Sequence, residues 1–177
     1  MKRVLCLLAD GFEEIEFTAP VDLLRRAGVE VVVAAIHGIQ ATGRSGIRVI
    51  ADVALTDQCE GDFDLLFIPG GPGVGELRRD GRAASMARAF HAAGKPVAAI
   101  CAAPLVLHDA GLLDGRNFTA HRSVTGQLAD ALNERVVEDG NLITSRGAGT
   151  AIDFALVLVA RLTDQDTAGK IAADIMA

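Results

Sequence analysis

Cys101 has the sequence context of a reactive thiol. It follows the apolar run 96–100 (PVAAI) and precedes 102–107 (AAPLVL), a pattern that predicts a short buried strand turning at once into a helix. A side chain at such a bend lies beside backbone N–H groups without a helical partner, and the helix dipole favours an anion there. We therefore expect a thiol pKa well below the usual value of about 8.5, although a small buried hydrophobic side chain is the alternative.

A carboxyl group is supplied by the acidic segment 10–16 (DGFEEIE), directly after the first apolar run. Acidic residues in a first helical turn commonly compensate the helix dipole, and this interpretation suffices for Glu13 and Glu14. Glu16 stands between two apolar residues, so it can point back toward the edge of a sheet. If it is partly buried there, its pKa rises and it can hydrogen-bond a thiolate or pass a proton to a substrate.

Two further segments carry groups that suit the same chemistry. Glycines in the run 69–73 (PGGPG) can offer free N–H groups to an oxyanion, although a plain tight loop is the alternative, and the run matches no phosphate-binding motif. His121 follows Cys101 by twenty residues and could accept the thiol's proton, although a lone histidine is more often structural. No histidine spacing typical of a metal site is present, so we expect no bound metal.

These residues must be positioned by the elements around them, which alternate between strands and helices. This alternation predicts an α/β fold with a mostly parallel sheet covered by helices on both faces. The expected strands are 4–8, 29–35, 64–68, 97–100, 136–137 and 142–143, with a hairpin or edge excursion in 38–57 and an extended piece at 117–120. The expected helices are 12–27 with a break near Pro20, 83–93, one after Cys101, 124–132, 152–162 and a short closing helix.

Ligands of an open α/β sheet bind outside the carboxyl ends of its strands. The acidic loop, the glycine run and the bend at Cys101 all follow predicted core strands. We therefore expect these three segments to converge on one site.

Composition limits the classes of function. The chain has 177 residues, 50% of them hydrophobic, and a formal net charge of −6. We expect one domain spanning 1–177, no membrane span and no secretory signal, because the first apolar run is short and reads as a strand. An acidic chain without Trp or Tyr gives no support for nucleic-acid binding.

The three cysteines do not form a disulfide framework or a zinc site. Cys6 lies inside the first predicted strand and reads as core, whereas Cys59 reads as a loop thiol without an evident activator. The odd number of thiols favours a reducing compartment, and we expect the cytoplasm.

Several segments together resemble the DJ-one/ThiJ/PfpI superfamily, and most closely its DJ-one and YajL branch. The matching stretches are 9–22 (ADGFEEIEFTAPVD), 24–28 (LRRAG), 68–71 (IPGG), 97–104 (VAAICAAP) and 143–154 (ITSRGAGTAIDF). The resemblance covers nearly the whole chain. It implies a flavodoxin-like three-layer sandwich, usually a homodimer, with a reactive cysteine at the bend.

The resemblance also implies roles for individual residues. Glu16 corresponds to a protonated acid that hydrogen-bonds the nucleophile Cys101, and His121 corresponds to a pocket histidine. The N–H groups of the glycine loop and of the residue after the cysteine would stabilise an oxyanion. These residues are Gly70, Gly71 and Ala102. Arg26, retained in LRRAG, and Glu13 are further candidates for a pocket or dimer contact.

Residues and resemblance together predict a glyoxalase or deglycase that needs no cofactor. Its substrate would be methylglyoxal, glyoxal or their early adducts. The alternative is a redox-sensing stress protein with chaperone-like activity, acting through oxidation of Cys101 to a sulfinate. The protease-like branch of the superfamily has a histidine directly after its cysteine, where this chain has Ala102, so we do not expect a peptidase. A role in thiazole phosphate synthesis ranks last because no phosphate-binding loop is present.

Overall fold

The computed structural model describes residues 1–55 and 62–177, and within these ranges the chain forms a seven-stranded sheet beside a separate two-stranded hairpin. The sheet order is β5-β2-β1-β6-β7-β9-β8, and every neighbouring pair is parallel except β8 with β9. The sheet strands are β1 (Arg3–Leu8), β2 (Glu30–Ala35), β5 (Val53–Ala54), β6 (Leu65–Ile68), β7 (Val97–Ile100), β8 (Val136–Asp139) and β9 (Leu142–Ser145). The hairpin pairs β3 (Gln40–Thr42) with β4 (Arg48–Ile50) in antiparallel fashion.

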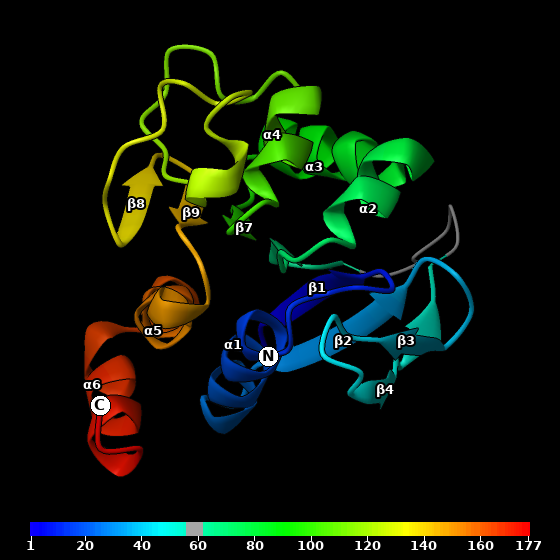
Figure 1. Cartoon of the computed structure of the whole chain (residues 1–177). Helices are drawn as coiled ribbons and strands as arrows, with labels where there is room; N and C mark the ends of the chain where they lie inside the picture. Colours follow the sequence, from blue (N-terminus) through cyan, green and yellow to red (C-terminus); the bar gives the residue numbers. More distant parts are fainter. Residues whose placement is uncertain (56–61) are drawn as a thin grey trace.

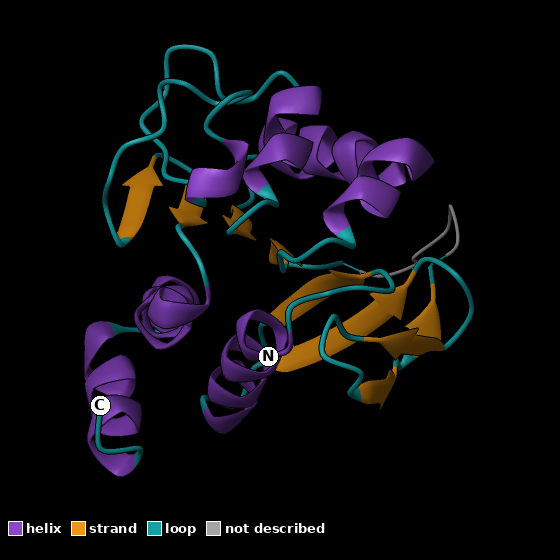
Figure 2. Ribbon diagram, in the orientation of Figure 1, coloured by secondary structure: helices purple, strands orange, loops and turns teal. Residues whose placement is uncertain are grey.

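Helices cover both faces of this sheet (Figures 1 and 2). One face carries α1 (Glu14–Arg26), α5 (Ala151–Leu162) and α6 (Gln165–Asp174), and the other carries α2 (Val74–Asp80), α3 (Arg82–Ala92) and α4 (Pro104–Asp109). The predicted flavodoxin-like three-layer sandwich is therefore confirmed.

Strand β1 shows how the sequence builds the two cores. Val4, Cys6 and Leu8 pack into the cluster beneath α1 and α5, whereas Leu5 and Leu7 pack into the cluster beneath α2, α3 and α4. Side chains alternate between the faces of a strand, so a run that is apolar throughout is buried on both sides. This run fixes β1 in the interior of the sheet.

Two sequence predictions about helices are wrong. Helix α1 continues through Pro20 without the expected break. Proline cannot donate an N–H to the carbonyl of residue 16, but Pro20 is buried against the core, and packing of α1 on α5 compensates for that lost bond. The predicted helix 124–132 is also absent: a 3₁₀ turn at Arg122–Val124 is followed by irregular turns. Gly126 disfavours a helix there, and the loop buries Val124 and Leu128 without one.

One helix was not predicted at all. Helix α2 follows the glycine run directly and buries Val74 and Leu77, and Gly81 ends it with a φ of 80°. The glycines around its start indicated loop, because glycine disfavours a helix interior.

The carboxyl edge of the sheet brings the loops after β1 and β6 into contact. The Glu13 N–H donates to the Gly70 carbonyl at 3.0 Å, and the Gly73 N–H donates to the Gly11 carbonyl at 3.0 Å. The hairpin contacts the same loops, since the Gly11 N–H donates to the Thr42 carbonyl at 2.7 Å.

Of the three cysteines, Cys6 is fully buried as predicted, and Cys59 lies outside the described residues. Across 1–55 and 62–177, no helix is both long and apolar enough to cross a bilayer.

Candidate functional site

Cys101 occupies a strained backbone conformation at the end of β7. Its φ is 66°, in the left-handed region that residues with a side chain rarely adopt. Neighbouring backbone holds it there: the Cys101 N–H donates to the Ser145 carbonyl at 2.8 Å, and the Cys101 carbonyl accepts the His121 N–H at 2.8 Å. A turn at 101–103 then leads into α4, so the thiol projects from a sharp bend between strand and helix.

Glu16 lies in the first turn of α1 and is 1% exposed. Its Oε2 accepts the Gly70 N–H at 3.1 Å, and the carboxyl group also contacts the Ala148 N–H and the Cys101 thiol. Glu13 caps the same helix by accepting the Glu16 N–H at 2.8 Å. The cap orients the first turn so that the Glu16 side chain points toward the carboxyl edge of the sheet.

Gly70 allows the carboxyl group and the thiol to meet. A Cβ built on Gly70 would collide with Glu16 Oε2 and would lie 2.6 Å from Cys101 Cβ. Gly71 has a φ of 95°, and a Cβ there would lie 2.6 Å from the Glu13 nitrogen. The N–H groups of Gly71 and Ala102 both contact the Cys101 thiol. The structure thus brings together the carboxyl group, the thiol and the two backbone N–H groups for which the resemblance implies an oxyanion-binding role.

The acid and the thiol influence each other's titration. Burial raises the pKa of Glu16 to about 7, while contacts with the Cys101 thiol and with the Gly70 and Ala148 N–H groups act to lower it. Burial, and then the facing Glu16 carboxylate, raise the pKa of Cys101 to about 12 against the N–H groups of Gly71 and Ala102. The expected low thiol pKa is wrong for a thiol facing an ionised carboxylate. Above about pH 7 the two groups share one proton and one negative charge.

The His121 side chain lies near this pair, and its Nδ1 hydrogen-bonds Ser123 rather than the thiol. Its Nδ1 accepts the Ser123 N–H at 3.2 Å and lies 2.8 Å from the Ser123 hydroxyl, so a neutral ring carries its proton on Nε2. The other edge of the ring faces Gly147: a Cβ built on Gly147 would lie 3.3 Å from His121 Cδ2 and 3.8 Å from Glu16 Oε1. His121 and Glu16 therefore both lie beside Gly147.

Arg26 lies away from the site. It is the last residue of α1, at the opposite end from Glu16, and pairs with Asp22 at 2.9 Å and with Asp174 at 3.2 Å. These ion pairs are exposed and of the kind that contributes little to stability. The structure thus separates Arg26 from the other candidates, and it gives Glu13 a helix-capping role.

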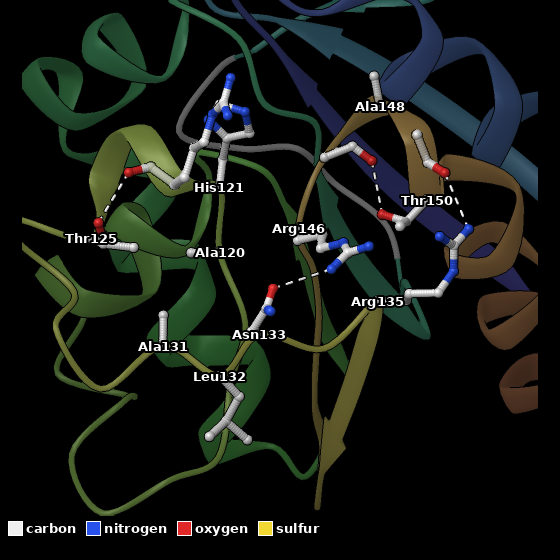
Figure 3. Close-up of a pocket in the computed structure, with 13 residues that line it drawn as sticks. Ala120, His121, Thr125, Ala131, Leu132, Asn133, Arg135, Arg146, Ala148 and Thr150 are labelled. Carbon is white, nitrogen blue, oxygen red and sulfur yellow. Dashed lines mark hydrogen bonds between the residues drawn. The ribbon is translucent and has the colours of Figure 1, made fainter.

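A pocket of about 720 Å³ is lined by His121 and other residues drawn in Figure 3. It adjoins the pair because its lining includes Ala148, whose N–H contacts the Glu16 carboxyl group. It is lined by residues 120–122, 125, 131–133, 135 and 146–150. The segment 144–150 was not among the predicted site residues, although it lies in the matching stretch 143–154. The position of that segment, after a core strand beside β7, is the signal that could have placed it at the site. Among residues 1–55 and 62–177, no three His, Cys, Asp or Glu side chains converge as a metal ion would require.

Comparison with known proteins gives consistent matches. The family model described as the DJ-1/PfpI family matches residues 2–161. Protein dj-1beta of Drosophila melanogaster is 36% identical over 181 residues, covering 99% of this chain and 97% of its own length. A Pyrococcus abyssi protein named as a deglycase is 36% identical over 151 residues, covering 83% and 91%. YraA of Bacillus subtilis, whose name describes a candidate cysteine protease, is 41% identical over 150 residues, covering 82% and 89%.

A solved structure extends the match to the fold. The structure described as Toxoplasma gondii DJ-1, oxidized, superimposes with a TM-score of 0.93 at 36% identity, covering 99% of this chain and 98% of that one. The family model, the relatives and the solved structure agree over nearly the whole chain. The chain belongs to the DJ-1/PfpI family.

Proposed function

We propose that this chain is a cofactor-independent glyoxalase or deglycase that converts methylglyoxal, glyoxal or their early adducts. One observation carries the proposal: the Cys101 thiol, at a left-handed bend, contacts a buried carboxyl group whose pKa is about 7. A base with that pKa is matched to proton transfer near neutral pH. The relative named as a deglycase supports the same chemistry.

The first step is addition of the thiol to an aldehyde. The Cys101 proton passes to the Glu16 carboxylate as sulfur bonds to the aldehyde carbon, and the electron pair of the C=O bond moves to oxygen. The N–H groups of Gly71 and Ala102 contact the sulfur, so they lie close to the new oxyanion and can hold its charge. Glu16 then returns the proton to that oxygen, which gives a hemithioacetal and restores the carboxylate.

The second step moves hydrogen between the two carbons. Glu16 removes the hydrogen from the former aldehyde carbon, and the electron pair moves onto the ketone oxygen, where the Nε2–H of His121 can donate a hydrogen bond. The hydroxyl proton shifts to that oxygen, and Glu16 delivers its proton to the second carbon as a thioester forms. Water then hydrolyses the thioester, so methylglyoxal plus water yields lactate and the free thiol without an external oxidant.

The wild-type chain provides the direct test of this proposal. Purified protein incubated with methylglyoxal, without glutathione or added metal, should form lactate that proton NMR detects. A rate of lactate formation equal to that of buffer alone would contradict the proposal. The proposal assigns no peptidase activity despite the name of YraA, because Ala102 stands where the protease-like branch has a histidine.

The site also suits oxidation of its thiol. The N–H groups of Gly71 and Ala102 and a protonated Glu16 are placed to hydrogen-bond the oxygens of a sulfinate on Cys101, and one similar structure is described as oxidized. The second candidate function is therefore a redox-sensing stress protein with chaperone-like activity.

This second candidate predicts stable oxidation at one cysteine. Mild peroxide should add two oxygen atoms to the intact mass, and the gain should disappear in Cys101→Ser, because Cys6 is fully buried and the sequence gives Cys59 no evident activator. Peptide mass spectrometry would locate the oxygens. Equal oxygen uptake by Cys101→Ser would contradict a sensing role for this residue.

We also expect two copies of the chain to associate, in the cytoplasm, where the thiol stays reduced. Four exposed isoleucines lie on the hairpin, α1 and α5: Ile47 is 58% exposed, Ile50 is 77% exposed on β4, and Ile15 and Ile152 are exposed on α1 and α5. The Ser45 N–H donates to Glu14 Oε1 at 2.7 Å, which ties the hairpin to α1. An apolar surface of this kind suits a self-complementary dimer contact.

Charge placed on this surface should separate the copies. Wild-type protein at micromolar concentration should show twice the chain mass of 18.4 kDa in light scattering after size exclusion, and Ile47→Asp with Ile50→Asp should show the single mass. The matched control is Met176→Asp, an exposed apolar residue near the chain end. A monomeric wild type, or a dimeric double variant, would contradict this surface as the interface.

A further inference from the structure

The charged side chains that line the pocket beside His121 are all arginines. Arg122, Arg135 and Arg146 contribute to its wall, and none of its lining residues is Asp or Glu. The whole chain carries a formal net charge of −6, so the charge of this pocket is opposite in sign to the net charge of the molecule. A concave surface lined by one sign of charge concentrates ligands of the opposite sign.

The three arginines are not equivalent. Arg135 forms an ion pair with Asp153 and donates to the Gly149 carbonyl, so its charge is already balanced. Arg146 donates to the neutral Asn133 Oδ1 at 3.2 Å, and Figure 3 shows its side chain in the middle of the lining residues. Among the described residues, no carboxylate lies within ion-pair distance of Arg146 or Arg122. These two guanidinium groups are available to an anion from outside.

The pocket is continuous with the catalytic residues. Its wall includes His121, and it includes Gly147 and Ala148, which border the Glu16 carboxyl group. Arg122 directly follows His121, and Arg146 directly precedes Gly147. A substrate that reaches the thiol past Gly147 therefore has its distal end beside these arginines.

The size of the pocket exceeds what methylglyoxal needs. Its volume of about 720 Å³ falls in the range of pockets that enclose drug-sized ligands, whereas methylglyoxal has three carbons. We propose that Arg122 and Arg146 form a subsite for an anionic group, a carboxylate or a phosphate, carried by the physiological aldehyde or adduct. This inference rests on the proposed function, and it adds the charge class of the substrate.

A matched pair of substrates tests the subsite. 4,5-Dioxopentanoate is methylglyoxal with a carboxymethyl group on its methyl carbon, and its methyl ester is the neutral counterpart. We expect the wild-type kcat/KM for the acid to exceed that for the ester by about tenfold or more, mainly through KM, because guanidinium–carboxylate hydrogen bonds are charge-assisted. Arg122→Ala combined with Arg146→Gln should abolish this preference, because kcat/KM for the acid should fall to the value for the ester.

Two control variants separate the subsite from general charge and from folding. Arg88→Ala removes an exposed arginine of α3 that does not line the pocket, and it should leave the preference unchanged. Arg146→Lys keeps the charge and should retain part of the preference. Equal wild-type kcat/KM for acid and ester, or an equal loss for both substrates in the double variant, would overturn the inference. Hydroxypyruvaldehyde phosphate in the same assay identifies whether phosphate or carboxylate is preferred.

A binding measurement keeps the inference testable if no turnover occurs. 4-Oxopentanoate has the same carboxylate and ketone but lacks the aldehyde, and its affinity for the Cys101→Ser protein can be measured by NMR titration. Binding that weakens about tenfold on removal of both arginines supports the subsite even if the glyoxalase proposal fails. Binding that is absent, or unchanged by their removal, overturns the subsite whatever the activity shows.

Discussion

Cys101→Ser should abolish lactate formation from methylglyoxal, with a loss of about a thousandfold or more. A serine hydroxyl is a much weaker nucleophile than a thiol, and the Glu16 carboxylate, with a pKa of about 7, is too weak a base to ionise it. The variant should keep its fold, because the backbone bonds that hold the bend come from Ser145 and His121 and do not involve the side chain. Initial rates and circular dichroism of the same preparations measure both expectations.

Cys6→Ala is the matched control for this substitution. Cys6 is fully buried in β1, and burial raises the pKa of its thiol far above neutrality. Its removal should reduce stability through lost packing while leaving the rate of lactate formation within about twofold. A Cys101→Ser rate above about a tenth of wild type would show that another group makes the first bond.

Glu16→Gln should slow turnover by about a hundredfold or more, because the amide cannot accept the thiol proton or shuttle hydrogen between the carbons. The wild-type rate should rise as pH increases through about 7, where the pair of Glu16 and Cys101 loses a proton. The rate of the Glu16→Gln variant should not rise with pH in this range. The measurement is kcat/KM for methylglyoxal between pH 5 and pH 9.

The same substitution should change the pH dependence of stability. The pKa of Glu16 is raised to about 7 in the fold, so the folded state favours the protonated carboxyl group. The free energy of unfolding of wild type should therefore fall as pH rises from about 4.5 to about 7, by up to about 3 kcal/mol. Glu16→Gln should remove that decrease in urea denaturation curves taken at pH 5 and pH 8.

Glu14→Gln provides the control two residues away on the same helix. Although burial acts against it, bonding to Ser45 and other backbone N–H groups lowers the pKa of Glu14, so this group does not titrate near pH 7. The rise of the rate through about pH 7 should persist in Glu14→Gln. Its persistence in Glu16→Gln as well would contradict the role of Glu16 as the proton-transfer group.

The fold could be predicted from the sequence because strands buried on both faces leave an unambiguous pattern. The run 4–8 has no polar position, and the segments after β1, β6 and β7 had to meet at one edge once the sheet was parallel. That argument brought Glu16, Gly70 and Cys101 together in advance. The sign of the Cys101 pKa shift could not be obtained the same way, because it depends on a buried carboxylate facing the thiol rather than on the helix end alone.

The pocket was harder to predict because its wall has little regular structure. Residues 122–133 form a 3₁₀ turn followed by irregular turns and bury single residues such as Val124 and Leu128. Neither helical periodicity nor strand alternation describes such a segment. Arg122 and Arg146 come from segments far apart in the sequence, and only their common position beside His121 and Gly147 relates them. Spacing in the chain carries no information about such a pair.

The left-handed bend at Cys101 acquires its surroundings late in folding. Its partners Glu16 and Gly70 follow β1 and β6, and all three segments meet only after the middle of the sheet has reached its native register. Parallel pairing between distant segments is slow compared with local helix formation. A newly synthesised or heat-opened chain therefore carries an ordinary cysteine, and the contact between the Cys101 thiol and the Glu16 carboxyl group forms only as folding is completed.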